Sequence, residues 1–215
     1  MTVHIVGLDL GQARDYSALV VTERLTTAPS GPRERTGERR DVVHLERWQL
    51  GTPYPVIVDR VVDLMAEPSL ADATLVMDAT GVGRGIVDLF HAARRDGRLR
   101  RYPVAVTITA GLEATGWHVP KRDLVSRLQA LLQTGALRIA EGLPLGDVLE
   151  RELLAFRAKL TAAGNDKYEA LREGDHDDLV LALALSCWHR GQGEPRYVGR
   201  DGRRFEHRAL CPEPY

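Results

Sequence analysis

Four aspartates stand at positions where a carboxylate is costly. Asp9 lies inside the apolar stretch IVGLDLG, Asp78 ends the apolar run TLVMD, and Asp177 and Asp178 begin the run DDLVLALAL. A carboxylate buried without a partner costs several kcal/mol, so each of them needs a cation or a bound metal. Each acid alone also has a structural explanation, because strand ends are often polar and because acids favour helix N-termini.

Brought to one point, the four carboxylates would form a metal-binding site. Converging anions repel one another strongly, and divalent cations would remove that repulsion. Oxygen ligands suit Mg²⁺ or Mn²⁺. Two such ions about 3.5–4 Å apart can activate a water molecule and stabilise the leaving oxygen of a phosphodiester. We therefore predict a two-metal site for phosphodiester hydrolysis, with Mg²⁺ or Mn²⁺ as the cofactor.

Several nearby residues are candidates for supporting roles. Lys121 begins a predicted helix, where it could contact the scissile phosphate or stabilise the transition state. Residues that could hydrogen-bond the metal ligands or orient water are Gln12, Asp15, Ser17 and His176. The alternatives are a solvated first helical turn, a polar β-turn and a structural histidine.

Arginine-rich stretches are candidate contacts for DNA, although the net charge of −1 does not by itself indicate nucleic acid. They are residues 31–40, 94–101 and the tail from 189 to 208. Arginine side chains suit phosphates, so DNA contacts should be sequence-tolerant. Solvated loops are the alternative interpretation. The predicted DNA-binding residues are Arg84, Arg94, Arg95, Lys121 and Arg122.

A sheet and its helices must position these residues. Residues 3–10, 15–25 and 41–50 have the alternating pattern of strands and predict a three-stranded antiparallel meander. Further strands are predicted over residues 73–80, 102–111 and 136–142. Apolar spacing and end signals predict helices over residues 53–67, 119–135 and 145–156, and one that follows the loop at the start of 81–97.

A hairpin and a buried helix complete the predicted domain. Residues 156–174, FRAKLTAAGNDKYEALREG, predict a β-hairpin with its turn at GND. Residues 174–190 are apolar nearly all round after Asp178, which is typical of a buried helix. The order predicts an α/β fold, an RNase H-like mixed β-sheet flanked by α-helices, with an added C-terminal β-hairpin. Residues 1–190 form this domain, and residues 191–215 are expected to be a loosely ordered basic tail.

Length and composition exclude several classes of protein. The 215 residues suffice for one domain with a sizeable core, and 44% hydrophobic with 27% charged residues is typical of a globular protein. No apolar run reaches the roughly 18–20 residues that span a membrane, and no signal peptide is expected. Cys187 and Cys211 indicate neither a disulfide framework nor a Cys/His zinc site, so a cytoplasmic location is expected.

Four stretches in this order resemble the nuclease domain of phage terminase large subunits, which package and cut viral DNA. They are GLDLGQARDYSALVV, VMDATGVGRGIVDLF, WHVPKRDLVSRLQALLQTGALRIA and REGDHDDLVLALAL, and the resemblance covers about residues 3–190. It implies an RNase H-like fold and a two-metal endonuclease that cuts concatemeric double-stranded DNA. It also implies that Asp9, Asp78 and the Asp177–Asp178 pair bind the metals, with Asp178 the first choice within the pair.

One part of a full terminase is missing. No GxxxxGK[ST] phosphate loop occurs, and GVGRG after Asp78 has the glycines without the Lys-Ser/Thr. The chain is therefore expected to be an excised nuclease domain or a stand-alone homologue, and DNA translocation is not assigned to it. The resemblance implies a separate packaging ATPase, a small terminase subunit or a portal as partners, no membrane, and the host cytoplasm as the location.

Three alternative functions stay open at the level of the sequence. The opening GLDLGQ also resembles the phosphate-binding start of actin-like and sugar-kinase ATPases, although those folds need two such domains and 215 residues are too few. The helix DHDDLVLALAL is compatible with a Holliday-junction-resolvase-like nuclease. A catalytically weak DNA-binding module is the third alternative, and the presence of all four acids disfavours it.

Overall fold

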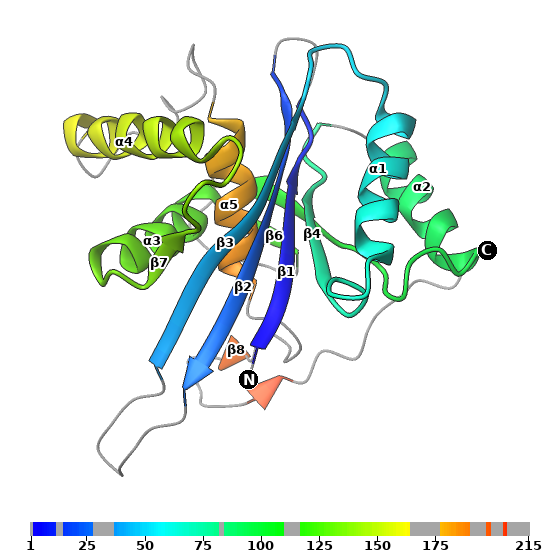
Figure 1. Ribbon diagram of the computed structural model, residues 1–215, viewed down its shortest axis with the longest axis horizontal. Coiled ribbons are helices and arrows are strands. Elements are labelled where there is room, and N and C mark those ends of the chain that lie inside the picture. Colours follow the sequence, from blue (N-terminus) through cyan, green and yellow to red (C-terminus); the bar gives the residue numbers. More distant parts are fainter. Residues whose placement is uncertain are drawn as a thin grey trace.

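A mixed seven-stranded β-sheet forms the centre of the computed structural model (Figure 1). The structure describes residues 2–11, 15–27, 37–81, 84–109, 117–163, 177–189, 197–198 and 204–205. The strand order is β6-β5-β4-β1-β2-β3-β7, in which β1 to β3 form an antiparallel meander, β4 to β6 run parallel to β1, and β7 runs parallel to β3. The strands are β1 (Thr2–Asp9), β2 (Ser17–Thr27), β3 (Gly37–Trp48), β4 (Thr74–Asp78), β5 (Val104–Thr109), β6 (His118–Pro120) and β7 (Leu137–Ile139).

Helices of the described chain cover both faces of this sheet. The helices on one face are α1 (Tyr54–Ala66) and α2 (Arg84–Arg95), and those on the other are α3 (Lys121–Gln133), α4 (Gly146–Ala163) and α5 (Asp178–Trp188) (Figure 1). Successive side chains of a strand point to opposite faces, so each strand supplies two layers. In β1, for example, Val6 and Leu8 join the hydrophobic cluster of α1 and α2, whereas Ile5 joins that of α3, α4 and α5.

The central helix α5 is buried along almost its whole length and lies directly against β1 and β2. Its contact with β1 depends on Gly7, where an added Cβ would lie 1.9 Å from the carbonyl oxygen of Ala182. Glycine is needed where two backbones approach so closely. Asp9 follows Gly7 by two residues, so both face α5. This contact therefore fixes the position of α5 relative to the end of β1.

The predicted fold class is confirmed, and two predicted elements need correction. Residues 119–120, predicted as the start of a helix, belong to the short strand β6, because residues 118–120 pair with β5, and α3 begins at Lys121. The hairpin predicted over residues 156–174 is wrong in its first part, because α4 continues to Ala163. The run AKLTAA contains mostly good helix formers and no apolar-polar alternation. Residues 164–174 lie outside the described residues.

The C-terminal segment predicted as a tail is described at four residues. There β8 (Tyr197–Val198) pairs antiparallel with β9 (Arg204–Phe205). The domain boundary at residue 190 stays a prediction. In the described part of the chain, no helix is long and apolar enough to cross a membrane.

Candidate active site

A row of side chains crosses one face of the sheet at the ends of its central strands. Asp9 and Asp78 are the last residues of β1 and β4, which are parallel neighbours in register. On the other side of β1, Asp9 is opposite Ala18 of β2, and Ala18 is opposite Arg47 of β3. Residues that are directly opposite one another point to the same face. The row Asp78, Asp9, Ala18 and Arg47 therefore faces α5.

The N-terminus of α5 brings two more carboxylates to this row. The helix begins at Asp178, and Asp177 is its N-cap residue. Asp178 is 4% exposed, Asp9 is 7% exposed and Asp78 is 8% exposed. Acids from β1, β4 and α5, which are far apart in the sequence, thus lie in one largely buried region.

The pKa of Asp9 reports how closely these acids converge. Burial raises the pKa of Asp9 well above its ordinary value, and the negative charges of Asp78, Asp178, Asp177 and Asp15 raise it further, in that order. A like charge disfavours ionisation noticeably only when it is near and poorly screened. Asp78, Asp177 and Asp178 therefore lie near enough to Asp9 to disfavour its ionisation, while their binding of a metal stays a prediction.

The loop after β4 orients Asp78. Its Oδ1 accepts a hydrogen bond of 2.7 Å from the backbone N–H of Thr80. The hydroxyl of Thr80 in turn accepts a hydrogen bond of 2.7 Å from the backbone N–H of Ile108, in β5. Asp78 is thus held at one oxygen by a turn that is itself tied to the neighbouring strand.

The backbone of Gly11, two residues after Asp9, is also held by hydrogen bonds. Ser17 Oγ accepts a bond of 3.1 Å from the backbone N–H of Gly11, and the hydroxyl of Tyr54 donates one of 2.9 Å to the Gly11 carbonyl. Asp15 is exposed and affects Asp9 through its charge. The structure therefore gives Ser17 a contact with Gly11, while any supporting role in chemistry stays a prediction.

The sequence analysis misses two residues of the site, Arg47 and Glu152. The Arg47 guanidinium donates a hydrogen bond to Glu152 of α4, and lies 3.7 Å from Asp178 Oδ2 and 5.1 Å from the centre of the Tyr16 ring. Burial raises the pKa of Glu152, while Arg47 and two backbone N–H groups of α5 oppose that rise. Charged residues in an alternating strand or an amphipathic helix usually face solvent, so the sequence carries little signal for either.

The predicted basic residues fall at two different places. Because β4, β5 and β6 are parallel, Lys121 and Arg122, which follow β6, lie at the same edge of the sheet as Asp78. The helix α2 runs back from that edge for 12 residues, about 18 Å, so Arg94 and Arg95 in its last turn lie toward the opposite edge. Gln12 and His176 lie outside the described residues, as does the side chain of Arg84.

The acids at the site offer only oxygen ligands, which fit a hard divalent cation. Carboxylates suit Mg²⁺ and Mn²⁺, and a cation would relieve the repulsion that raises the pKa of Asp9. Among the residues that the structure describes, no three His, Cys, Asp or Glu side chains are already arranged to hold a metal ion.

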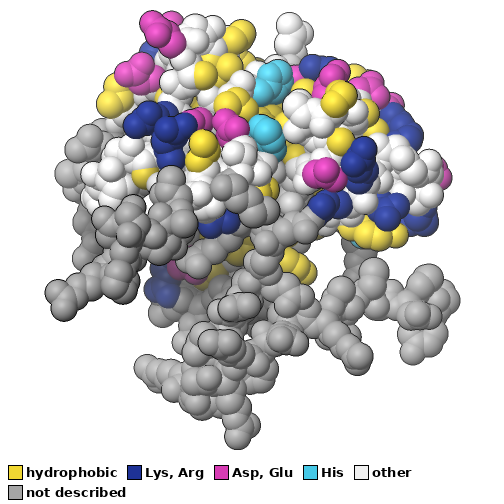
Figure 2. All heavy atoms as spheres, turned by 60° about the horizontal axis from the view of Figure 1, so that its bottom comes forward, with side chains coloured by type: hydrophobic (Ala, Val, Ile, Leu, Met, Phe, Trp, Pro, Cys, Tyr) yellow, Lys and Arg dark blue, Asp and Glu magenta, His cyan; other side chains and the backbone are white. Residues whose placement is uncertain are grey.

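Basic side chains are spread over the face shown in Figure 2 rather than gathered in one patch. Lys and Arg lie both on the side of α1 and α2 and on the opposite side, with Asp and Glu among them. Exposed ion pairs of the described chain join Arg98 with Asp59 and Arg100 with Asp72. This face does not define a path for DNA, and the DNA-binding residues stay predictions.

Comparison with known proteins identifies the family of the chain. One solved structure similar to it is the crystal structure of the large terminase nuclease from thermophilic phage G20c, with 23% sequence identity, a TM-score of 0.49, and coverage of 86% of this chain and 81% of that chain. No curated protein matches the chain. The family model described as the terminase RNaseH-like domain matches residues 6–189, a segment that contains all four acids. The chain therefore belongs to the terminase RNaseH-like domain family.

Proposed function

We propose that the protein is a metal-dependent DNA endonuclease of the terminase large subunit type. The observation that carries the proposal is that Asp9 and Asp78 end neighbouring parallel strands, and that Asp177 and Asp178 begin the helix on the same face of the sheet. Three of these four carboxylates are nearly fully buried. Burying like charges together costs too much for them to serve packing alone. Binding of divalent cations would explain why these acids are buried together. The family to which the chain belongs supports a nuclease activity.

Asp9, Asp78 and Asp178 would hold the metal ions, with Asp177 as a further oxygen donor beside them. A bound pair of Mg²⁺ or Mn²⁺ ions supplies an activated water and neutralises charge on the phosphodiester in two-metal hydrolysis. Asp9 and Asp78 end rigid strands, and the Thr80 N–H fixes one oxygen of Asp78. Ligands placed on such elements keep their geometry.

Other residues of the chain would bind and orient the substrate. Lys121 lies at the same edge of the sheet as Asp78, where its ammonium group would bind phosphate and stabilise transition-state charge. Ser17 would help to position the backbone that follows Asp9, because its hydroxyl accepts a hydrogen bond from Gly11. Candidates for hydrogen bonds to the metal ligands or to water are Gln12, Asp15 and His176.

The proposed substrate is concatemeric double-stranded viral DNA, cut during genome packaging. Contacts to its phosphates would be sequence-tolerant and would come from the predicted basic residues. Translocation would require a separate packaging ATPase, and a small terminase subunit and a portal are further proposed partners. A phage-encoded protein of this kind would act in the host cytoplasm.

Cleavage of supercoiled plasmid tests this proposal. The protein should nick or linearise plasmid with Mn²⁺ or Mg²⁺, and should be inactive in EDTA. Asp9→Ala and Asp78→Ala should abolish cleavage without unfolding the protein, whereas Asp88→Ala, an exposed position on α2, should cleave like the wild type. Wild-type cleavage by either site variant would contradict the metal assignment. Preferential cleavage of four-way junctions over linear duplex would indicate a resolvase-like nuclease instead.

A further inference from the structure

One nitrogen of Arg47 lies between two carboxylates at the site. Its Nη2 donates a hydrogen bond to Oε1 of Glu152, and the same atom lies 3.7 Å from Oδ2 of Asp178. The side chains of Arg47, Glu152 and Asp178 are 16%, 8% and 5% exposed. Arg47 is therefore bonded to Glu152 and only within ion-pair range of Asp178.

The fold holds Glu152 beside the start of α5. Its neighbours on α4, Leu149 and Leu153, are buried in the same hydrophobic cluster as α5. The backbone N–H groups of Leu179 and Val180, in the first turn of α5, favour the charged form of Glu152 and lower its pKa against the effect of burial. The carboxylate thus occupies the positive end of α5, next to Asp178.

Arg47 and a divalent cation would compete for Asp178. A guanidinium bonded to a carboxylate at about 2.7–2.9 Å forms a strong charge-assisted pair. Such a pair would occupy an oxygen that a metal needs and would put a positive charge beside the metal. The distance of 3.7 Å leaves the Arg47 nitrogen about 0.9 Å short of that bond.

We propose that Glu152 is a positioning residue that keeps Arg47 from forming a hydrogen bond with Asp178, so that Arg47 does not compete with a divalent cation for that carboxylate. The inference rests on the proposed function and deepens it, since Glu152 acts through Arg47 rather than as a ligand. Glu152 balances most of the positive charge of Arg47, so that charge opposes a cation at the four aspartates less than an unpaired arginine would. The Tyr16 ring, 5.1 Å from the guanidinium carbon, provides a further contact for Arg47.

Mn²⁺ binding to the whole protein without DNA, measured by isothermal titration calorimetry, tests this role. Glu152→Gln keeps the size and an oxygen that can accept from the α5 N–H groups, but it removes the charge that holds Arg47. Arg47 should then bond to Asp178, and Mn²⁺ affinity should fall about tenfold or more. In Arg47→Met/Glu152→Gln no guanidinium is left to compete, so affinity should return to within about threefold of the wild type.

This rescue separates positioning from a merely structural role, because a lost structural contact would leave the double variant at least as weak as Glu152→Gln. Glu150→Gln, an exposed position on the same helix, is the matched control and should bind like the wild type. Arg47→Met alone should bind Mn²⁺ at least as tightly as the wild type, and this holds whether or not Glu152→Gln folds.

Three results would overturn the inference alone, given folded variants by circular dichroism. They are wild-type affinity in Glu152→Gln, no recovery in the double variant, and weaker Mn²⁺ binding in Arg47→Met. A wild-type protein that binds no Mn²⁺, or whose binding survives Asp9→Asn, would remove the proposed metal site and this inference together.

Discussion

The buried carboxylate of Asp9 should make the metal-free protein less stable. Its side chain is largely buried, and its pKa is raised first by burial and then by four neighbouring aspartates. Repulsion among these like charges therefore lowers the free energy of unfolding. Functional sites commonly destabilise the proteins that carry them. At Asp9 we expect stability and function to oppose each other.

Replacing Asp9 by asparagine should stabilise the protein in EDTA. Burial and the neighbouring charges that raise the pKa of Asp9 also oppose folding with the carboxylate ionised, so removing that carboxylate should increase the free energy of unfolding. Addition of Mn²⁺ should raise the melting temperature of the wild type and leave that of Asp9→Asn nearly unchanged, since a bound ligand stabilises only the state that binds it. Differential scanning calorimetry measures both effects, with Asp88→Asn as the control. A less stable Asp9→Asn with an intact Mn²⁺ response would show that Asp9 serves packing.

The sequence reveals the acids of the site but not the residues that surround them. Asp9 and Asp78 are recognisable because each is a charged residue in or at the end of an apolar run. This pattern is visible in the sequence without knowledge of the fold. Arg47 and Glu152 lie in segments where charge is ordinary, so their burial depends on strand register and on how α4 meets α5. Such pairings between distant segments are properties of tertiary structure, which local patterns do not encode.

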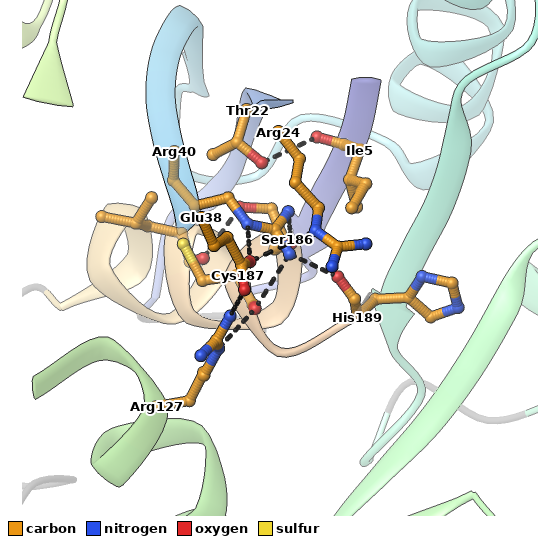
Figure 3. A network of polar contacts seen from close by, with 10 residues as sticks. Ile5, Thr22, Arg24, Glu38, Arg40, Arg127, Ser186, Cys187 and His189 are labelled. Atoms are coloured by element: carbon orange, nitrogen blue, oxygen red, sulfur yellow. Dashed lines mark hydrogen bonds and ion pairs between the residues drawn. The ribbon is translucent and has the colours of Figure 1, made fainter. Parts of the chain in front are cut away.

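At the scale of the element, α5 is fixed at its C-terminal end by a buried arginine (Figure 3). Arg40 of β3 is 0% exposed. Its guanidinium donates to the carbonyls of Ser186, Cys187 and His189 at 3.2, 3.4 and 2.8 Å, and to Glu38 at 3.0 Å. These carbonyls end a helix and would otherwise lack partners within it. The acids at the N-terminal end of the same helix depend on this anchorage.

Arg40→Met should destabilise the protein by about 3 kcal/mol, because several buried carbonyls lose a charged donor. Its neighbour Arg39 is the matched control, since its side chain is 41% exposed and pairs with Asp41 at the surface. Arg39→Met should cost less than about 1 kcal/mol. Urea denaturation of both variants measures the difference. Equal losses would mean that the C-terminal end of α5 is held by other contacts.

The contact at Gly7 fixes how closely the middle of α5 approaches β1. Gly7→Ala would place a Cβ 1.9 Å from the carbonyl oxygen of Ala182, so α5 must move away from β1. We expect a loss of about 1–3 kcal/mol in urea denaturation, together with weaker Mn²⁺ binding, because the first turn of α5 carries Asp178. Gly85→Ala, where a Cβ meets nothing within 4 Å, should be neutral or slightly stabilising. Unchanged stability and Mn²⁺ affinity in Gly7→Ala would show that the site does not depend on this contact.

Elements were predictable where the pattern of one segment decides its conformation. The β1 to β3 meander and the buried helix α5 follow from alternation and from an unbroken apolar run. The strand β6 was not predictable, because its three residues form a strand only through pairing with β5. Residues 156–163 are helical, although the turn residues GND predict a hairpin there, because the run before GND consists mostly of good helix formers.

At the scale of the whole molecule, the sheet separates the predicted basic residues. The acids and the start of α3 lie at one edge, and the last turn of α2 lies toward the other. A duplex that reaches the acids must approach the first edge. Lys121 and Arg122 are then placed to contact its phosphates. The duplex would have to extend around the molecule to contact Arg94 and Arg95 as well. With a net charge of −1, only such local contacts can attract DNA.

Salt dependence of DNA binding distinguishes these two groups. Each phosphate contact contributes about 0.9 to the slope of log K against log salt, so Lys121→Ala/Arg122→Ala should reduce the slope by about 2. Arg94→Ala/Arg95→Ala should change it little, because these arginines lie away from the acids. Fluorescence anisotropy of a short duplex, with Ca²⁺ in place of Mg²⁺ and salt varied, gives the slopes. A larger change in Arg94→Ala/Arg95→Ala would mean that DNA extends over the far edge of the sheet, and a flat slope in the wild type would mean that neither group binds phosphate.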